Sequence, residues 1–508
     1  MLPLSEIGRS HLGNLGSIPY HGVLRDFVDL TVHQFDVVVV GAGSAGMIAA
    51  YAAARTGART CLVEGTGIVG GTTFALGNVV SFHNNRMEPV VAGFPQLIVD
   101  QTIEAGGARP GGHIRNPGGM CGTVTLLDPE ILRFVMTELL EEAGVELLLH
   151  TSLVDAIMRD RRIVGIRILN KSGLQDIYAQ VIVDCTGDAD VAAKAEAAYE
   201  QDAPGKSLSA TLLFRVAGVD SSRFVEDLKR YPDKMVLLED PYLREKQALD
   251  SREVIVNEVK SIFDLPYVYL TNLVRDYIPK KDWPDWGVIG IEKAEWGRLK
   301  PFGSRVHFSP SPLRSDILYV NTTNLHIDAS DGAQRSRAEV EGLRQVRLML
   351  DILRRYIPGF ESSYLLNIMP AISVRASRRI IGRYRLTRAD VENGVRFPDS
   401  IARGCYPMSV QSETEPNVRY HLYVKDGKDY DIPYRCLIPE EIDGLLVAGR
   451  CLSATREASG SARCGAQCMA LGQAAGTAAA LSVEQGLLPG TLDFQILRQR
   501  LIAQRAIV

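Results

Sequence analysis

The segment from Phe35 to Glu64 constrains the fold of this chain more than any other. It reads FDVVVVGAGSAGMIAAYAAARTGARTCLVE, an apolar run followed by glycines at 41, 43 and 46. The valines at 37–40 predict a buried parallel strand, and the GxGxxG spacing predicts a tight turn into a helix. Such a turn presents backbone N–H groups and the positive end of the helix dipole to a pyrophosphate.

The acid that closes this segment indicates the kind of nucleotide. Glu64 follows the second predicted strand, 59–63, and stands 23 residues after Gly41. An acid there accepts hydrogen bonds from a ribose 2′-OH and repels a 2′-phosphate. The motif therefore predicts an adenine dinucleotide such as FAD or NAD and disfavours NADP, without choosing between the first two. The residues expected to hold the dinucleotide at this turn are Gly41, Gly43, Ser44, Ala45, Gly46 and Glu64.

Length and composition set broader limits. A chain of 508 residues exceeds one hydrophobic core and predicts two or more domains. A formal charge of −4 gives no basic excess for nucleic acid, and neither a membrane span nor a signal sequence is visible. Eight scattered cysteines contain no CxxC pair, so we expect reduced, mostly buried thiols, no metal site and a cytoplasmic location.

The organisation of the chain predicts an α/β protein. Residues 152–158, 163–169 and 177–183 alternate like β-strands, and the texture changes between 208 and 420, where β-like segments mix with charged helices. We expect a Rossmann-like domain that binds FAD or NAD, a parallel sheet with a β-meander, and an inserted α+β substrate domain of mainly antiparallel sheet. The expected boundaries are 1–34 for an N-terminal arm, 35–85, 121–205 and 430–508 for this dinucleotide-binding domain, which is the FAD-binding domain if the cofactor is FAD, and 86–120 and 206–429 for the substrate or cap domain.

A late helix over 460–481 is unusually rich in small residues. Glycine costs about 1 kcal/mol relative to alanine in a helix interior, so its presence indicates a backbone packed close to a sheet or a flat ligand. The alternative is tight helix–sheet packing only. The helix N-terminus around Arg463 and Gln467 would stabilise negative charge at the N1–O2 edge of a reduced flavin.

Four stretches of the chain together resemble a known family. They are VVVVGAGSAG with Glu64 and the run Gly70-Gly71-Thr72-Thr73, DCTGDADVAAKA at 184–195, VRASRRIIGRYRLT at 374–387, and IPYRCLIP with GLLVAGRCLSATREASGSARCGAQCMALGQAAG within 432–476. With them the chain resembles FAD-dependent oxidoreductases of the two-dinucleotide-binding-domain group, which includes fumarate reductase flavoproteins. It most resembles a broad bacterial family of FAD-dependent dehydrogenases. The resemblance spans nearly the whole chain and implies FAD.

The resemblance also implies further contacts to the cofactor. Some relatives link the flavin to a histidine shortly before the glycine doublet, and residues 65–69 contain none, so non-covalent FAD is implied. The nearer relatives carry Asp and His shortly after a Tyr-Pro, where this chain has Ser409 and Gln411. The residues implied to approach FAD beyond the first turn are Gly65, Gly70, Gly71, Thr72, Thr73, Val154, Thr186, Gly187, Asp188, Gly449 and Arg450.

A flavin accepts the hydride, so the protein must bind, orient and move a proton. His83, 12 residues after Gly71, is the first candidate, and its alternative is an ordinary hydrogen-bonded histidine. His307 is a second candidate, on a predicted strand of the substrate domain. Tyr406 would donate a proton or stack on the substrate, or merely pack beside Pro407.

Three guanidiniums lie within five residues at Arg375, Arg378 and Arg379. They repel one another unless anions neutralise them, so they grip an acidic substrate or the FAD pyrophosphate, or form salt bridges across a domain interface.

Taken together, we expect an FAD-dependent oxidoreductase that transfers a hydride between flavin N5 and a small organic substrate at the domain interface. The alternatives are a flavin-carrying electron-transfer subunit of a larger redox complex and an NAD-binding protein without catalysis. The expected partners are the small-molecule substrate and an external electron donor or acceptor, with a homo-oligomer possible and with no nucleic acid and no membrane.

Overall fold

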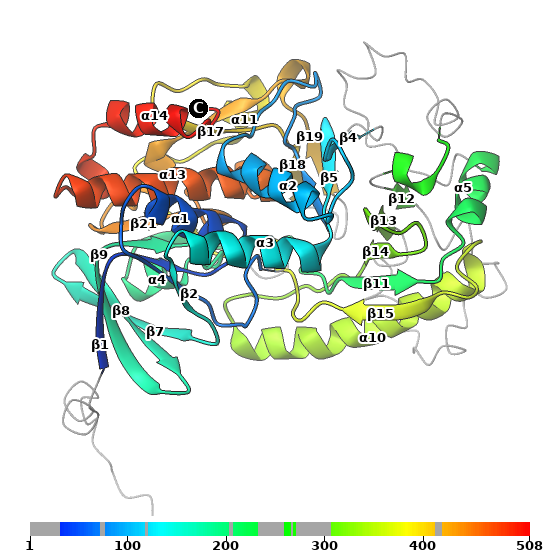
Figure 1. Cartoon of the computed structure of the whole chain (residues 1–508), viewed down its shortest axis with the longest axis horizontal. Helices are drawn as coiled ribbons and strands as arrows, with labels where there is room; N and C mark the ends of the chain where they lie inside the picture. Colours follow the sequence, from blue (N-terminus) through cyan, green and yellow to red (C-terminus); the bar gives the residue numbers. More distant parts are fainter. Residues whose placement is uncertain are drawn as a thin grey trace, which may run out of the picture.

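The computed structural model describes residues 31–71, 77–116, 120–202, 207–231, 259–265, 268–270, 306–411 and 419–508. Two of the residues expected near the flavin, Thr72 and Thr73, lie outside these ranges. The larger of two main sheets forms one side of the molecule, and an antiparallel sheet forms the other (Figure 1).

The larger sheet has a parallel core that begins with the valine strand. Its neighbours in space run in the order β6, β2, β1, β9 and β21, and every adjacent pair is parallel. β1 starts at Thr31, so residues 31–34 of the expected arm pair with β9. The strands are β1 (Thr31–Val40), β2 (Thr60–Val63), β6 (Glu146–Leu148), β9 (Gly173–Asp184) and β21 (Leu445–Val447).

A β-meander extends this sheet at its far edge. β7 (Ser152–Arg159), β8 (Arg162–Asn170) and the first half of β9 pair antiparallel in chain order. β9 also pairs with β1, in parallel, from Gln175 to Asp184. The combination of parallel sheet and β-meander confirms the predicted Rossmann-like fold class.

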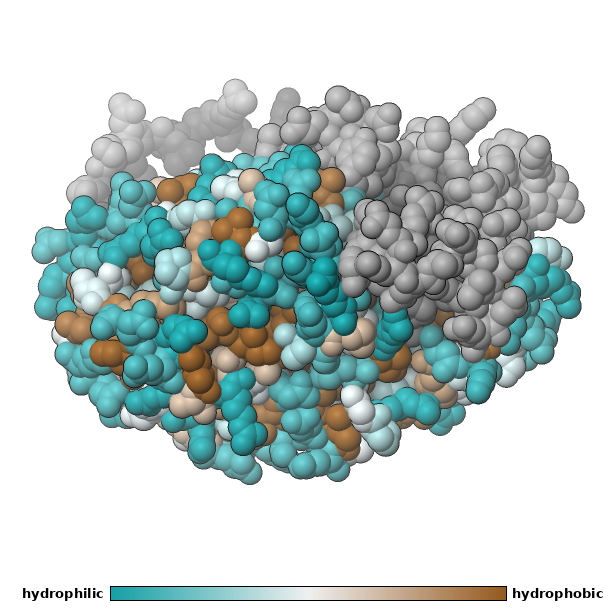
Figure 2. Space-filling model, turned by 90° about the horizontal axis from the view of Figure 1, so that it is seen from above, coloured by the Kyte–Doolittle hydropathy of each residue, from teal (hydrophilic) through white to brown (hydrophobic). Residues whose placement is uncertain are grey.

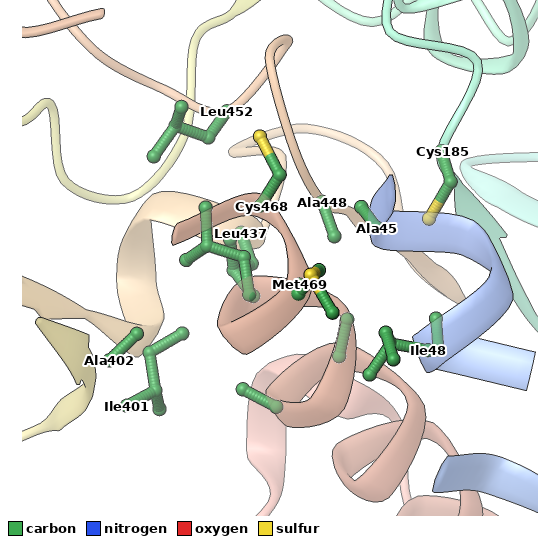
Figure 3. Close-up of a cluster of buried hydrophobic side chains, with 14 of the residues drawn as sticks. Ala45, Ile48, Cys185, Ile401, Ala402, Leu437, Ala448, Leu452, Cys468 and Met469 are labelled. Carbon is green, nitrogen blue, oxygen red and sulfur yellow. The ribbon is translucent and has the colours of Figure 1, made fainter. Parts of the chain in front are cut away.

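Two helices pack backbone against backbone beside the sheet. These are α1 (Ser44–Arg55) and α13 (Gly465–Glu484), and β-carbons added at Gly472 and Gly476 would overlap carbonyl oxygens of α1. Figure 3 shows α13 between Ala45 and Ile48 of α1 on one side and Ile401 on the other. The small residues of α13 therefore allow close contact with another helix, α1. From composition, the expected neighbour is a sheet or a flat ligand.

The predicted late helix is divided in two. α12 (Arg456–Ala462) ends where Arg463 caps it, and α13 restarts at Gly465. The N-terminus of α13 therefore lies in the region, around Arg463 and Gln467, where the sequence predicts a helix N-terminus.

A small sheet and two helices cover the same core. The sheet consists of β3 (Asn78–Val80), β4 (His113–Arg115) and β5 (Thr123–Leu126), and the helices are α2 (Phe94–Glu104) and α3 (Pro129–Glu142). Asp128 caps α3 and Pro129 is its first residue, a position where proline's missing N–H costs no hydrogen bond. α2 contacts α1, α3 and α13. We therefore propose that residues 86–116 belong with the dinucleotide-binding part rather than with the cap.

The second main sheet is antiparallel and has its own hydrophobic cluster. Its order is β12, β13, β14, β11 and β15, and the long helix α10 lies along it (Figure 1). Its apolar cluster extends from Ala210 to Ile372, so we propose a cap of about these limits. The elements are β11 (Phe214–Ala217), α5 (Ser221–Arg230), β12 (Val268–Leu270), β13 (Val306–Pro310), β14 (Leu318–Asn321), α10 (Gly332–Tyr356) and β15 (Tyr364–Ile368).

Shorter elements connect the two parts and cover the first core. Ile401 and Ala402 of β17 belong to the cluster around α13, so we propose that 400–404 belong with the dinucleotide-binding part. The remaining elements are α4 (Asp190–Lys194), β10 (Tyr199–Glu200), β16 (Arg379–Ile380), α11 (Arg388–Asn393), β17 (Ser400–Gly404), β18 (Met408–Gln411), β19 (Arg419–Leu422), β20 (Tyr430–Pro433), α14 (Phe494–Ala503), and the 3-10 turns Ile262–Asp264, Lys425–Gly427, Tyr434–Leu437 and Pro489–Thr491.

The surface seen from above is mainly hydrophilic, with apolar side chains in separate groups (Figure 2). Among the described helices, none combines the length and the hydropathy that a membrane span requires. All eight cysteines are buried, and none forms a disulfide.

Candidate functional site: a dinucleotide cradle facing the cap sheet

The three glycines of the first turn meet different surroundings. Gly41 has φ +94°, and a β-carbon there would lie 2.6 Å from the carbonyl oxygen of Cys185. A β-carbon on Gly46 would overlap Gly41 O. A β-carbon on Gly43 would meet nothing within 4 Å. Two glycines thus close the strand–helix packing, and the third leaves open space at the start of α1.

The N-terminus of α1 has unsatisfied polar groups beside this space. Gly43 is the N-cap residue and provides no side-chain cap. Ser44 Oγ is buried and has no hydrogen-bond partner among the described residues. Free amide groups and an unpartnered hydroxyl at a helix N-terminus fit a bound phosphate. Ala45 continues the turn and packs against Gly449, whose added β-carbon would lie 3.0 Å from Ala45 Cβ.

Glu64 ties the second strand to the glycine turn. Its Oε2 accepts the backbone N–H of Ala42 at 2.8 Å, and its Oε1 accepts the N–H and the hydroxyl of Thr66 at 2.8 and 2.9 Å. Gly65 follows, with nothing within 4 Å of an added β-carbon. The Glu64 carbonyl accepts the N–H of Thr151, immediately before the strand that carries the half-buried Val154.

The glycine doublet lies against the same turn. Gly70 N donates to Ala42 O at 2.7 Å, and a β-carbon on Gly71 would lie 3.0 Å from Gly43 Cα. The backbone of 70–71 therefore forms a second wall of the space beside Gly43.

A buried carboxyl holds the turn at the end of β9. Asp184 Oδ1 accepts the N–H and the hydroxyl of Thr186 at 3.0 and 2.7 Å, and Oδ2 accepts the N–H of Ala192 at 2.9 Å. Burial raises the pKa of Asp184 to about 6, against the lowering effect of these hydrogen bonds. The turn abuts the first glycine motif, since Cys185 N donates to Val40 O.

An ion-pair network joins this turn to the cap. Arg450 Nε donates to Gly187 O at 2.8 Å, and its terminal nitrogen lies 2.7 Å from Asp188 Oδ1. Arg335, on α10 of the cap, contacts the other oxygen of Asp188 at 3.0 Å. Asp188 and Arg450, both implied as cofactor residues, thus form an ion pair with each other, and Arg450 also bonds the turn at Gly187.

Carboxylates neutralise two of the three clustered arginines. Arg378 contacts Asp190 at 2.9 Å, and Arg379 contacts Asp202 at 2.8 Å. Arg375 instead donates to the carbonyl of Ser209 and, at 3.0 Å, to Asn321 Oδ1. Arg378 and Arg379 thus form salt bridges, as the alternative expects, but with carboxylates outside the proposed cap rather than across its boundary, whereas Arg375 is directed to the cap sheet.

Unpartnered polar atoms also mark the start of α13. Gln467 is fully buried; its Nε2 donates to Ser81 O at 3.4 Å, and its Oε1 has no partner among the described residues. Arg463 Nε is buried and equally unpartnered within the described ranges. A polar ligand edge at the helix N-terminus would satisfy both groups.

Both the hydroxyl and the backbone carbonyl of Tyr406 have polar contacts. Its hydroxyl lies 2.6 Å from Met120 Sδ, and its carbonyl accepts the hydroxyl of Ser461. Farther along the same segment, Ser409 Oγ is 3.2 Å from His421 Nδ1. Sequence reasoning missed His421, because only the register of β18 with β19 brings it opposite Ser409.

His83 lies near the start of α13 and beside a second histidine. The His83 carbonyl is 3.5 Å from the thiol of Cys405, which also contacts Ser81 O, the acceptor for Gln467. The ring of His83 lies 5.1 Å from that of His113, edge to face. Burial lowers the pKa of His83. Sequence reasoning also missed His113, whose place depends on the pairing of β4 with β5.

His307 and Arg375 both lie next to Asn321 of the cap sheet. His307 pairs with Asn321 in the register of β13 with β14, so the two side chains share one face. Arg375 donates to Asn321 Oδ1. His307 and Arg375 are therefore brought together, whereas His83 belongs to the small sheet near α13.

The described features define a class of protein: a Rossmann-like fold whose glycine turn, acid and helix N-terminus form an adenine-dinucleotide cradle. Residues 36–501 match the family described as FAD dependent oxidoreductase, and the chain belongs to that family. It is thus an FAD-dependent enzyme, and FAD is the cofactor that the cradle fits.

The curated relatives match shorter stretches. A 3-oxosteroid 1-dehydrogenase of Mycobacterium tuberculosis is 48% identical over 58 residues, 11% of this chain and 10% of the relative. A thiamine thiazole synthase of Aeropyrum pernix is 32% identical over 165 residues, 30% of this chain and 54% of the relative. The chain thus spans between a tenth and about half of the length of these relatives.

Solved structures match over most of the chain. A geranylgeranyl bacteriochlorophyll reductase-like protein of Thermoplasma acidophilum is 12% identical with a TM-score of 0.45, covering 94% of this chain and 84% of its own. A flavin-dependent brominase is 12% identical with a TM-score of 0.42, covering 93% and 83%.

Proposed function

We propose that this enzyme transfers a hydride between N5 of non-covalently bound FAD and a small organic substrate held between the cradle and the cap sheet. FAD, when bound, supplies the hydride acceptor or donor. The protein's own residues hold the dinucleotide, orient the substrate and exclude water from the site.

The observation that carries this proposal is a contact between the cap sheet and the segment after the glycine doublet. Asn78 Nδ2 donates to Ser309 Oγ at 2.6 Å, and Gly77 abuts the ring of Tyr319. Ser309 and Tyr319 are paired residues on the sheet face that carries His307. This polar face is therefore turned toward the chain that leaves the cradle.

The roles of the side chains follow from this placement. We propose Gly43, Ser44 and Gly70–Gly71 around the pyrophosphate, with Glu64 on the adenosine ribose. Arg463 and Gln467 would meet the polar edge of the flavin, since both have unpartnered buried atoms in the described structure. Arg375 and His307 would meet the substrate from the cap.

The remaining implied cofactor residues have structural partners that position them. Thr186, Gly187 and Asp188 form the turn that Arg450 holds. We propose that this turn closes the cradle from the side opposite the glycine doublet. Tyr406 would border the substrate from the segment that Ser461 anchors.

Anaerobic reduction of the bound flavin tests the proposal. Purified holoenzyme is mixed with hydroxy acids, amines, sugars or steroids, and bleaching of the flavin absorbance is followed in a single turnover. We expect one class to bleach the flavin, and that class names the substrate. Steady turnover only in the presence of a second redox protein would favour the electron-transfer alternative, and protein that stays colourless after reconstitution with FAD would contradict both.

A variant pair locates the substrate. Arg375→Met is expected to raise the donor concentration needed for half-maximal bleaching about tenfold, because a charge-assisted contact contributes about 1.5 kcal/mol or more. Arg344→Met is the control, since Arg344 pairs with Glu341 on the exposed side of α10. Equal bleaching curves for both variants would remove Arg375 from the substrate site.

We also propose a cytoplasmic location, because eight buried thiols without a disulfide suit a reducing compartment.

Release of all FAD on acid precipitation would support its non-covalent attachment. Yellow colour that stays with the precipitate would contradict it.

A further inference from the structure

A chain of hydrogen bonds runs from the surface of α2 to the histidine pair. Asp100 is exposed, and its carboxylate accepts from Gln96 Nε2 at 2.9 Å. Gln96 Oε1 lies 2.9 Å from His113 Nε2, and His113 Nδ1 lies 2.6 Å from Thr125 Oγ1.

The chemistry of each group determines where the protons lie. A carboxylate only accepts, so the amide of Gln96 must present its NH₂ to Asp100 and its oxygen to His113. That oxygen requires a proton on His113 Nε2. His113 Nδ1 then carries the lone pair and accepts the hydroxyl proton of Thr125.

Thr123, two residues before Thr125 on β5, contacts His83 in a similar way. Thr123 Oγ1 accepts the His83 backbone N–H at 3.2 Å and lies 3.3 Å from His83 Nδ1. Thr123 is fully buried, and among the described residues His83 Nδ1 is the acceptor within reach of its hydroxyl proton, so the hydroxyl donates to Nδ1. The ring proton of neutral His83 is therefore on Nε2, which has no partner among the described residues.

The surroundings oppose a charge on either ring. Burial and the neighbouring His83 lower the pKa of His113 to about 4, although Asp100 acts in the other direction. Burial also lowers the pKa of His83. Charged and titratable groups on the elements around His83 include His113, Asp100, Arg86, Glu88, Asp429 and Cys405.

We propose that Thr123 holds His83 as a neutral imidazole with its proton on Nε2, and that Asp100, Gln96 and His113 are positioning residues that fix the ring packed edge to face against His83. His83 then serves the active site as a hydrogen-bond donor to an oxygen atom, and not as a general base. The oxygen belongs to a carbonyl or carboxylate group that gains negative charge in the reaction. This role of His83 rests on the proposed function, whereas the tautomer does not.

Nitrogen NMR of protein labelled with ¹⁵N-histidine tests the tautomer directly, with His83→Asn and His113→Asn used for assignment. We expect both rings to show the Nε2–H pattern at pH 8, His113 to stay neutral to below pH 6, and His83 to take up a proton at a lower pH than a free histidine. An Nδ1–H pattern for His83, or a His83 cation at pH 7, would overturn the proposal.

One variant tests the chain of hydrogen bonds. Gln96→Glu places a carboxylate on His113 Nε2 and should raise the proton affinity of His113 about tenfold or more. Gln101→Glu is the matched control, because Gln101 lies on the same helix and contacts exposed Glu104. An equal shift of His113 in the two variants would reject Gln96 as a positioning residue.

Comparison of the apoprotein with the FAD-loaded protein identifies the oxygen. A downfield shift of the His83 Nε2–H on FAD binding alone assigns it to the flavin, and a shift only with a reducing substrate assigns it to the substrate. The absence of any shift in the reacting complex contradicts the donor role. Protein that binds no FAD but shows the Nε2–H pattern would sink the proposed function and leave the tautomer standing.

Discussion

At the residue scale, one glycine motif contains three different physical constraints. Gly41 and Gly46 are enclosed by backbone, so a methyl group at either would collide with a carbonyl oxygen. Gly43 has open space and an ordinary φ of −72°. The protein itself therefore tolerates a side chain at position 43, and only a ligand phosphate would exclude it.

Gly43→Ala is accordingly expected to fold normally and to bind FAD at least about tenfold more weakly, a loss of about 1.4 kcal/mol. FAD fluorescence titration of the apoprotein measures the affinity, and thermal unfolding monitors the fold. Gly46→Ala provides the contrast, since its methyl group has to displace the turn itself and should destabilise the apoprotein. Unchanged FAD affinity in Gly43→Ala would move the phosphate away from this glycine.

His113 makes the stability of the fold sensitive to acid. Its folded-state pKa of about 4 lies below the ordinary histidine value of about 6.5, so the unfolded chain takes up a proton first as the pH falls. The contribution of neutral His113 to the free energy of unfolding is complete above about pH 6.5 and is lost progressively down to about pH 4. The loss is on the order of 2 kcal/mol.

Denaturant unfolding at pH 7 and pH 4.5 measures this contribution. His113→Gln should lose less stability between the two pH values than the wild type. His326→Gln, at an exposed histidine, should follow the wild type. A wild-type pH dependence in His113→Gln would assign the acid sensitivity to other groups.

At the scale of elements, the contact between α1 and α13 depends on small residues at two places. Gly476→Ala is expected to destabilise the protein by about 2 kcal/mol, because the new methyl group would overlap Ala49 O in a close-packed interface. Gly332→Ala is the control, at the first residue of α10 with nothing within 4 Å. Thermal or denaturant unfolding of both variants measures the difference, and equal stabilities would contradict this account of the packing.

The same elements show which predictions depend on local pattern. The glycine turn and the acid at the tip of β2 were predictable, because each follows from a fixed spacing within one strand–helix–strand segment. The division of the late helix into α12 and α13 was not. Small residues predict close packing, but they do not say whether a sheet, a ligand or another helix is the neighbour.

At the scale of the whole molecule, one buried carboxylate connects the cradle turn to the cap. Asp188 is 5% exposed and pairs with Arg450, 17% exposed, and with Arg335, 43% exposed. Arg450→Met should cost about 3 kcal/mol, because it removes the buried partner and leaves the turn's polar groups unsatisfied.

Arg335→Met should cost less than about 1 kcal/mol, because water replaces a half-exposed partner. Denaturant unfolding of both variants measures the two losses in stability. Arg354→Met is not a suitable control, because Arg354 donates a hydrogen bond to the Ser363 carbonyl. Exposed Arg344, whose ion pair within the described residues is with Glu341 on the same helix, serves instead. A larger loss for Arg335→Met than for Arg450→Met would reverse the assignment of the stabilising pair.

The sequence by itself determined the dinucleotide turn, the acid that favours FAD or NAD over NADP, the alternation that builds a β-meander and the fold class. These depend on spacings along the chain, which local backbone geometry converts directly into structure. The tertiary structure alone decided that Arg378 faces Asp190, that His113 stands beside His83 and that the cap sheet meets Gly77 and Asn78. Such contacts join distant segments, and strand register and side-chain packing, which no short pattern encodes, determine which residues meet.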